Sequence, residues 1–207
     1  MVMPPVLRAP GAFHEGALVW RLPDGLESLA SAPAGGGRAR PSWVLNIRVP
    51  MAYSRTDLDV HASEVADDEG LVGPGVALFT AASVERHARG AHGGATVDAT
   101  VGTTKPTWAA DASGGHGTWS PGTINTVAFV PVTLSEAAAV NIVMTMTEAK
   151  TQALLDAEIP GTGTASDAVV VLWPTGPDPE PFGGPRSPWG SKVALATYDA
   201  VRGAIAT

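Results

Sequence analysis

Charged side chains within an apolar segment are the first feature of this sequence that points to chemistry. Residues 133–157 are mostly Ala, Val, Ile, Met and Leu, yet they contain Glu148 and Lys150. Ionisable groups are costly to place in apolar surroundings unless they are paired or used. A positioned carboxylate can accept a proton during a reaction, and a positioned ammonium can donate one. Glu148 and Lys150 are therefore candidates for acid–base chemistry.

Helical spacing separates these two charges. Glu148 shares a stripe with Asn141, Thr145 and Gln152, because the four residues recur at i, i+4, i+7 and i+11. This stripe faces either solvent or a polar cavity, and the helix alone does not decide between them. Lys150 lies roughly 200° from Glu148 around the helix axis. In a regular helix Glu148 is therefore the better catalytic candidate, and Lys150 is an ion-paired or snorkelling residue.

The apolar segment is followed by a glycine- and threonine-rich loop, Gly161-Thr162-Gly163-Thr164-Ala165-Ser166-Asp167. Its backbone N–H groups and hydroxyls can surround an anion or a developing oxyanion. The alternative is an ordinary helix-to-strand turn, in which the glycines relieve backbone strain and Asp167 caps the turn. The loop is not a Walker A loop, since no Gly-Lys-Ser/Thr follows, and it lacks the third glycine of a dinucleotide fingerprint.

Other nucleophiles and metal ligands are sparse. The sequence has no cysteine and no Gly-x-Ser-x-Gly elbow. A threonine that follows a glycine would need a neighbouring base to act as a nucleophile, and the candidates of this kind are Thr103, Thr123, Thr162 and Thr164. The five histidines include no pair at i, i+4, so we expect no metal site. His61 and His87 fall on predicted surface helices, and His116 lies in a glycine-rich loop.

Composition limits the class of protein. A net charge of −7, with 13 Lys and Arg against 20 Asp and Glu, argues against nucleic-acid binding, which needs clustered positive charge. No segment reaches the roughly 18 apolar residues of a membrane span, and the amino terminus lacks the features of a secretory signal. We expect a soluble, cytoplasmic protein that folds as a single domain over residues 1–207.

The elements that must position these residues begin with a β-rich section. Short strands are expected at 17–22, 29–33 and 43–49, with a flexible segment at 34–40. The third strand places Asn46 and Arg48 on one polar face. It is followed by a helix at 58–69, a strand at 75–80, a short helix at 81–89, a strand at 95–101 and a long loop at 102–121.

The second half alternates strands and helices. We expect a strand at 123–130, a helix from 133 to about 157, a strand at 167–173 and a last helix at 189–206. Thr123 and Asn125 share a strand face, and Thr133 with Glu136 forms a capping box at the start of the long helix. The nearly continuous apolar run after Asp167 is typical of a strand covered on both faces. The pattern predicts an α/β protein, a single layered domain with a mixed β-sheet packed by helices.

Six short motifs stand in a fixed order along the chain. They are Asn46-x-x-Val49, Leu78-Phe79-Thr80-Ala81-Ala82, Thr100-Val101-Gly102, Pro121-Gly122-Thr123-Ile124-Asn125, Thr147-Glu148-Ala149-Lys150-Thr151 and Gly161-Thr162-Gly163-Thr164. In this order they resemble the adenosylcobinamide amidohydrolase family, and the resemblance runs from about residue 28 to 207. The Thr-Glu-Ala-Lys-Thr block is the most distinctive motif. One departure is that Ala165-Ser166 precede Asp167, where the family tends to have Asp directly after Gly-Thr-x-Thr.

The resemblance implies a hydrolase that cleaves the amide between the corrin ring and the aminopropanol arm of adenosylcobinamide. Its products would be adenosylcobyric acid and 1-amino-2-propanol, in cobinamide salvage for coenzyme B12 synthesis. The partner is then a small corrinoid substrate whose cobalt enters with it, so no protein cofactor is expected. The sequence leaves the oligomeric state open, a homo-oligomer included.

Amide hydrolysis assigns roles to the candidate residues. Glu148 is expected to act as general base, and Lys150 or Asp167 to protonate the leaving amine. Substrate binding is expected from Asn46, Thr123, Asn125, Asn141, Gly161, Thr162, Gly163 and Thr164. Two other functions stay open: a corrinoid-binding protein without catalysis, and a phosphate- or nucleotide-binding enzyme that uses the Gly-Thr loop.

Overall fold

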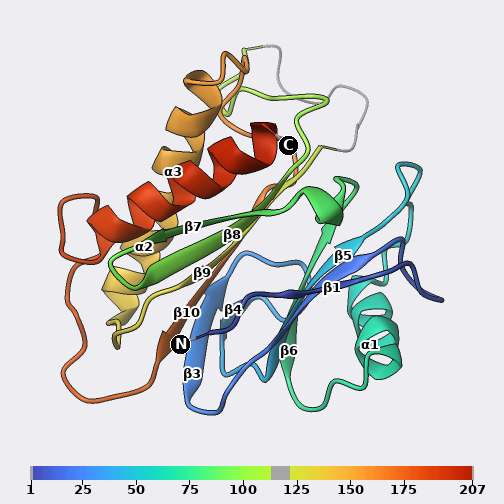
Figure 1. Cartoon of the computed structure of the whole chain (residues 1–207), viewed down its shortest axis with the longest axis horizontal. Coiled ribbons are helices and arrows are strands. Elements are labelled where there is room, and N and C mark those ends of the chain that lie inside the picture. The colour runs from blue at the N-terminus through green and yellow to red at the C-terminus, as the bar shows by residue number, and fades with distance from the viewer. Residues whose placement is uncertain (1, 113–121, 207) are drawn as a thin grey trace.

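The computed structural model describes residues 2–112 and 122–206. In this part of the chain the helices are α1 (Leu58–Asp68), α2 (Glu136–Leu155), α3 (Gly190–Ala206) and a short 3-10 helix (Val84–Arg86). Figure 1 shows α2 and α3 together on one side of the molecule and α1 on the other. None of the helices described is both long enough and apolar enough to cross a membrane.

The strands form two mixed sheets. The four-stranded sheet has the order β1 (Val6–Arg8), β2 (Ala17–Arg21), β5 (Trp43–Arg48) and β6 (Gly75–Thr80). The six-stranded sheet has the order β4 (Gly37–Ala39), β3 (Leu26–Ala30), β10 (Ala168–Pro174), β9 (Ile124–Phe129), β8 (Ala95–Val101) and β7 (Ala88–His92). One neighbouring pair in each sheet is parallel, β5 with β6 and β9 with β10. A helix connects the strands of each parallel pair, α1 in the first and α2 in the second.

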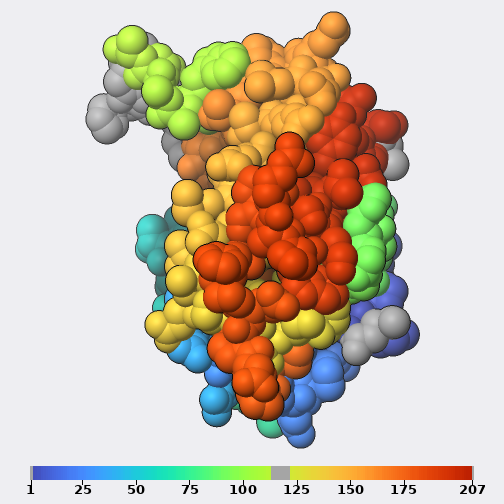
Figure 2. Space-filling model, turned by 90° about the vertical axis from the view of Figure 1, so that its left-hand side faces the viewer, coloured from blue at the N-terminus to red at the C-terminus, as the bar shows by residue number. Residues whose placement is uncertain are grey.

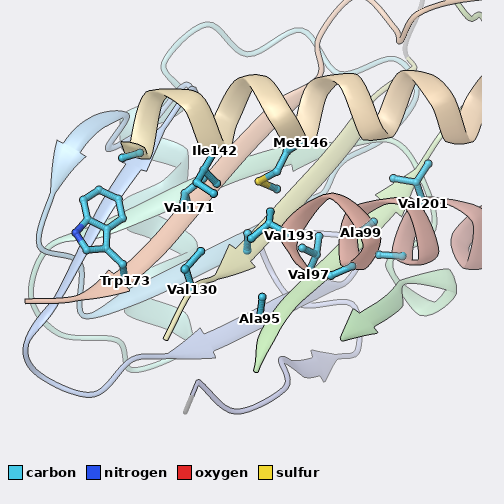
Figure 3. Close-up of a cluster of buried hydrophobic side chains, with 14 of the residues drawn as sticks. Ala95, Val97, Ala99, Val130, Ile142, Met146, Val171, Trp173, Val193 and Val201 are labelled. Atoms are coloured by element: carbon cyan, nitrogen blue, oxygen red, sulfur yellow. The ribbon is translucent and has the colours of Figure 1, made fainter. Parts of the chain in front are cut away.

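Two apolar clusters cover the two faces of the six-stranded sheet. Val171 and Trp173 of β10 face α2 and α3, where Ile142 and Met146 pack against them (Figure 3). Val170 and Leu172 of the same strand face the other way, into the space between the sheets. The expectation that this strand is covered on both faces is therefore confirmed. Helices α2 and α3 form much of the outer surface on this side (Figure 2).

The four-stranded sheet is likewise covered on both faces. Leu18 and Val44 pack against the six-stranded sheet, while Leu45 and Ile47 pack against Val65 of α1. The layers therefore run α1, four-stranded sheet, six-stranded sheet, and then α2 with α3. The predicted α/β class and β-rich first section are confirmed. The strands form two sheets where one was expected, because the apolar pattern of a strand does not say which sheet the strand joins.

Two segments differ from the sequence-based expectation. The helix predicted at 81–89 is a single 3-10 turn followed by the edge strand β7. Gly90 lies in β7 so close to α3 that a Cβ atom there would collide with the backbone of Ala196, so this strand supports the helix directly. The segment at 34–40, expected to be flexible, contains strand β4, which pairs with β3.

Candidate active site

A cavity of about 400 Å³ opens between the two sheets. Its apolar wall includes Val49, Tyr53 and Phe79, all from the four-stranded sheet or the loop after β5. The opposite wall is polar. Its polar residues from β9 and from the segments just before β9 and β10 are Thr123, Asn125, Ser166 and Asp167.

Strand direction explains why polar groups meet at this place. The residues at and after the carboxyl ends of β5 and β6, including Val49 and Thr80, reach the cavity from one side. The residues at the amino ends of β9 and β10, including Thr123 and Asp167, reach it from the other. Carboxyl ends of parallel strands are the common position of ligand sites in α/β sheets, and here only one of the two sheets contributes in that way.

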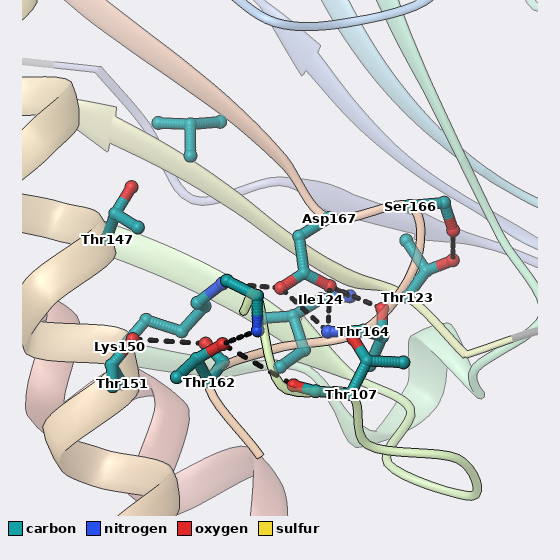
Figure 4. A network of polar contacts seen from close by, with 12 residues as sticks. Thr107, Thr123, Ile124, Thr147, Lys150, Thr151, Thr162, Thr164, Ser166 and Asp167 are labelled. Atoms are coloured by element: carbon teal, nitrogen blue, oxygen red, sulfur yellow. Dashed lines mark hydrogen bonds and ion pairs between the residues drawn. The ribbon is translucent and has the colours of Figure 1, made fainter. Parts of the chain in front are cut away.

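Asp167 is the centre of the polar wall (Figure 4). Its Oδ2 lies 2.5 Å from the ammonium nitrogen of Lys150, and its Oδ1 accepts the backbone N–H of Ile124 at 2.9 Å. The Thr164 hydroxyl lies 2.5 Å from Oδ1 and 2.6 Å from the carbonyl oxygen of Gly122. The Lys150 and Asp167 side chains are only 11% and 14% exposed. A buried ion pair of this kind persists because additional hydrogen bonds compensate for lost hydration.

The glycine-threonine loop does surround an anion, and that anion is the protein's own carboxylate. The N–H groups of Gly161 and Thr162 donate to backbone carbonyls at 2.9 and 2.8 Å. The N–H of Thr164 reaches both oxygens of Asp167 at 3.2 Å. The loop thus holds Asp167 in place, and its side chain folds back over Ala165 and Ser166 to contact Thr164.

Gly163 is required by the ion pair. A Cβ atom at this position would collide with Asp167 Oδ2 and with the Lys150 ammonium. The backbone of Gly163 also pairs with Thr107, whose N–H donates to its carbonyl oxygen at 2.8 Å. The glycine therefore allows the loop to lie directly against the Lys150–Asp167 pair.

Two hydroxyls line the cavity beside Asp167. Thr123 Oγ1 lies 2.7 Å from Ser166 Oγ, and Ser166 in turn donates to the carbonyl oxygen of Gly122 at 3.1 Å. Ser166 was not among the residues predicted from the sequence. Its position directly before Asp167 was the one available signal, because a residue next to a cavity-lining carboxylate often shares its cavity.

The two predicted asparagines meet in the buried space between the sheets. Asn125 Nδ2 donates to Asn46 Oδ1 at 2.8 Å and to the carbonyl oxygen of Phe79 at 3.0 Å. Asn46 Nδ2 donates to Thr100 Oγ1 at 2.9 Å. Asn46 and Asn125 are each 2% exposed, and Thr100 is 1% exposed. This amide chain crosses between the sheets, and of its two asparagines Asn125 lines the cavity.

The polar stripe on α2 faces away from this cavity. Glu148 is exposed in a shallow groove on the outer side of the helix, together with Thr147, Thr151 and Gln152. Asn141 is exposed, and its Nδ2 donates to the carbonyl oxygen of Ala137, one turn earlier in its own helix. The helix is regular through Leu155, so Lys150 and Glu148 point to different sides, as the spacing predicts.

Thr145, on the same predicted stripe, is buried. Its hydroxyl donates to the carbonyl oxygen of Gly183 at 3.0 Å. Of the four residues of the stripe, Thr145 is therefore packed inside the protein and the other three face solvent. None of the four lines the cavity.

His61 is not a surface residue, contrary to the sequence-based expectation. It is 3% exposed, because Phe13 and Tyr53 cover the inner side of α1. Burial raises the pKa of Tyr53, with smaller and opposing effects from nearby charges, so the phenol is protonated at neutral pH. The Phe13 carbonyl oxygen can only accept, so His61 Nε2 donates to it at 2.6 Å, and in the neutral ring Nδ1 then accepts the Tyr53 hydroxyl at 2.6 Å.

Thr103 and the histidines in the described part of the chain do not line the cavity. Across residues 2–112 and 122–206, no three His, Asp or Glu side chains form a group that could hold a metal ion. His116 lies outside the described residues. The rim of the cavity instead carries Arg55, whose fork binds Asp57 and Glu64 at 2.7 and 2.6 Å. The Arg55 hydrogen bonds lower the pKa of Asp57 to about 2.

Comparison with known proteins identifies the family. A family model described as adenosylcobinamide amidohydrolase matches residues 6–207. A protein of that name from Methanosarcina mazei is 28% identical over 182 residues, which cover 83% of this chain and 86% of that protein. Another, from Halobacterium salinarum, is 39% identical over 85 residues, or 41% of this chain and 36% of that protein. Since the family model spans nearly the whole sequence, the chain belongs to the adenosylcobinamide amidohydrolase family and is an amidohydrolase.

Proposed function

We propose that the protein hydrolyses the amide that joins the aminopropanol arm to the corrin ring of adenosylcobinamide. The products are adenosylcobyric acid and 1-amino-2-propanol, and the reaction returns an incomplete corrinoid to coenzyme B12 synthesis. Family membership supports the reaction class. The observation that supports its location is the Asp167–Lys150 pair at the wall of a cavity whose other side is apolar.

Asp167 is the group in this cavity best suited to activate water. Its Oδ1 is occupied by the Ile124 N–H and the Thr164 hydroxyl. Its Oδ2 accepts a hydrogen bond from the Lys150 ammonium at 2.5 Å and a longer one from the Thr164 N–H at 3.2 Å. Since the Thr164 N–H also reaches Oδ1, Oδ2 has the smaller set of donors of the two oxygens, and we assign to it the hydrogen bond from the attacking water. In this mechanism Asp167 takes a proton from water and returns it to the leaving nitrogen.

Lys150 and Thr123 assist this reaction from two sides. Lys150 lies behind Asp167, and its ammonium donates to Oδ2 and so fixes the orientation of the carboxylate. Thr123 donates its hydroxyl to the developing oxyanion after rotating from its contact with Ser166. The amide bond breaks, the carboxyl carbon gains the oxygen of water, and the nitrogen leaves as a protonated amine.

Asp167 and Glu148 are therefore two alternative candidates for the general base. Glu148 lies in the outer groove of α2 and does not line the cavity between the sheets. If the outer groove is the site, then Glu148 acts as base and Asp167 only holds Lys150. The two assignments predict opposite results from one pair of isosteric variants.

The test is turnover of adenosylcobinamide by purified protein, with and without a chelator, followed by chromatography of adenosylcobyric acid and aminopropanol. Asp167→Asn is expected to lower kcat by about 100-fold or more, because general-base catalysis contributes about 10²–10⁴. Glu148→Gln is expected to stay within about twofold, as an exposed substitution outside the cavity. The reverse pattern, with both variants folded by circular dichroism, would move the reaction to the α2 groove.

The same experiment decides between hydrolysis and the other functions. Tight corrinoid binding without release of aminopropanol would favour a corrinoid-binding protein. The nucleotide-binding alternative is disfavoured because Gly161, Thr162 and Thr164 already direct their N–H groups to acceptors within the protein. If ATP raised the melting temperature of the protein as much as the corrinoid does, the nucleotide-binding alternative would be supported.

A further inference from the structure

The side-chain oxygen of Asn125 is buried without a hydrogen-bond partner in the described part of the chain. The other end of the same amide is fully used, since Nδ2 donates to Asn46 Oδ1 and to the Phe79 carbonyl oxygen. Asn125 is 2% exposed and lines the cavity together with Asp167. A buried carbonyl oxygen without a donor is unfavourable, so its retention calls for a ligand that supplies one.

The orientation of this amide is determined by its neighbours. The Phe79 carbonyl oxygen can only accept, so the Asn125 atom 3.0 Å from it must be the nitrogen. Asn46 fixes the same orientation a second time, because it presents Oδ1 to Asn125 while its own Nδ2 donates to Thr100. Exchange of the oxygen and nitrogen of Asn125 would place two acceptors against each other at Phe79. The free group of Asn125 is thus an acceptor, and it requires a donor.

Burial and position single out this atom. Four other side-chain atoms are buried without a partner in the described residues: Ser28 Oγ, Arg48 Nε, Thr126 Oγ1 and Trp173 Nε1. None of these residues lines the cavity between the sheets, whereas Asn125 does. Thr126 is the neighbour of Asn125 in β9, so its side chain lies on the opposite face of the strand.

We propose that Asn125 Oδ1 accepts a hydrogen bond from the N–H of the scissile amide of the corrinoid. This inference rests on the proposed function, and it adds the group that selects an amide. Asn46 and Thr100 are positioning residues, because their hydrogen bonds fix the Asn125 amide with its nitrogen toward Asn46 and its oxygen left without a donor. The contact fixes the plane of the substrate amide relative to Asp167, so water approaches its carbonyl carbon from the Asp167 side.

The decisive probe is an ester analogue of adenosylcobinamide, in which oxygen replaces the scissile N–H. Binding of both compounds is measured by rapid ultrafiltration on ice, and chromatography confirms that the ligand stays intact. Wild-type protein is expected to bind the amide about tenfold or more tightly than the ester, since the ester leaves Asn125 Oδ1 without a donor. Equal affinities would overturn the proposal without any variant being needed.

Variants locate the selectivity. Asn125→Leu is expected to weaken amide binding about tenfold and to leave ester binding nearly unchanged, so that the ratio approaches one. Thr100→Val is also expected to lower the ratio of amide affinity to ester affinity. Thr100→Ser keeps the hydroxyl and is expected to preserve this ratio. Thr126→Val is the matched control, because it removes a buried unpartnered hydroxyl from the other face of the same strand. Equal losses for amide and ester in Asn125→Leu would show that this residue contacts another part of the corrinoid.

Failure of the proposed function gives a different result. Wild-type protein that selects the amide but releases no aminopropanol would retain the role of Asn125 and refute hydrolysis. Turnover of adenosylcobinamide by a protein that binds amide and ester equally well would support hydrolysis and refute the role of Asn125. Absence of corrinoid binding would refute both.

Discussion

Asp167 and Lys150 combine strong mutual attraction with nearly complete removal from water. Their charges lie 2.5 Å apart, and the carboxylate is also bound by the Ile124 N–H. Removing one member of such a pair leaves the other charge buried and uncompensated, which is far more costly than removing both. The energetic value of the pair is therefore best measured as the interaction between two substitutions.

We predict strongly non-additive losses of stability for this pair. Lys150→Met and Asp167→Asn should each lower the free energy of unfolding, with Lys150→Met costing about 3–5 kcal/mol because it leaves a buried carboxylate. The double variant should lose clearly less than the sum of the two. Urea unfolding of the four proteins measures the interaction. Additive losses would mean that the two side chains are hydrated and independent.

The site illustrates which contacts a sequence can predict. Helical spacing correctly separates Lys150 from Glu148, because it depends only on residues of one helix. The contact of Lys150 with Asp167 depends on how α2 returns to β10, and that of Asn46 with Asn125 on how two sheets stack. Such contacts are determined by tertiary packing, which cannot be predicted from the spacing of residues along the chain. The catalytic and binding roles of all these residues stay predictions until the variants are measured.

At the scale of the element, the glycine-threonine loop is shaped by close packing. Gly163 leaves no space for a side chain between the loop and the ion pair. We predict that Gly163→Ala displaces the Lys150 ammonium and lowers the free energy of unfolding by about 1–3 kcal/mol. Turnover should fall with it, because the substitution acts on Asp167. Urea unfolding and product release give both values.

Gly184→Ala is the control for this prediction. A Cβ atom at Gly184 meets no atom within 4 Å, so its stability should change by less than about 0.5 kcal/mol. A loss at Gly184 as large as that at Gly163 would indicate a general sensitivity of glycines in this protein.

The start of α2 gives a second prediction at this scale. Ser135 is the N-cap, and its Oγ accepts the N–H of Ala138 at 3.1 Å. Thr133, which the sequence pattern favoured, lies two residues earlier, where its carbonyl oxygen accepts the N–H of Glu180. Ser135→Ala should therefore cost about 1 kcal/mol in thermal or urea unfolding, and Thr133→Ala clearly less. Equal losses would place the helix start at Thr133 after all.

The elements themselves were largely predictable, and their partners were not. Apolar alternation places β6 and β8 at their observed bounds, since local pattern decides strand formation. The error at 81–89 has a tertiary cause, because β7 is stabilised by pairing with β8 and by α3 packing against Gly90. Strand β4, within residues 34–40, likewise forms only because it pairs with β3.

At the scale of the whole molecule, the cavity is a consequence of stacking two sheets of different connectivity. The loops that leave β5 and β6 supply an apolar wall, and the turns that enter β9 and β10 supply a polar one. A single sheet would bring these residues to opposite ends. Within the six-stranded sheet and its covering helix, Glu27 of β3 binds Arg38 and Arg40, and Arg38 also pairs with Glu136 of α2.

Glu27 should make the stability of the whole molecule sensitive to acid. Burial alone would raise its pKa, but the hydrogen bonds and charges of Arg38 and Arg40 outweigh burial and lower the pKa below its ordinary value of 4.5. A carboxyl with a lower pKa in the folded state binds fewer protons there than in the unfolded chain. Its contribution is therefore complete above pH 4.5 and is lost as the pH falls through the folded-state pKa.

We expect Glu27→Gln to lower the free energy of unfolding by about 1–2 kcal/mol at pH 7, a modest value because both arginines are largely solvated. The difference from wild type should shrink as the pH falls below 4.5, since protonated Glu27 resembles glutamine. Urea unfolding of both proteins between neutral pH and pH 3 measures this convergence. Other carboxylates such as Asp57 act equally in both proteins, so the difference isolates Glu27. A gap that stays constant on acidification would mean that packing of the side chain, and not its charge, connects β3 to β4 and α2.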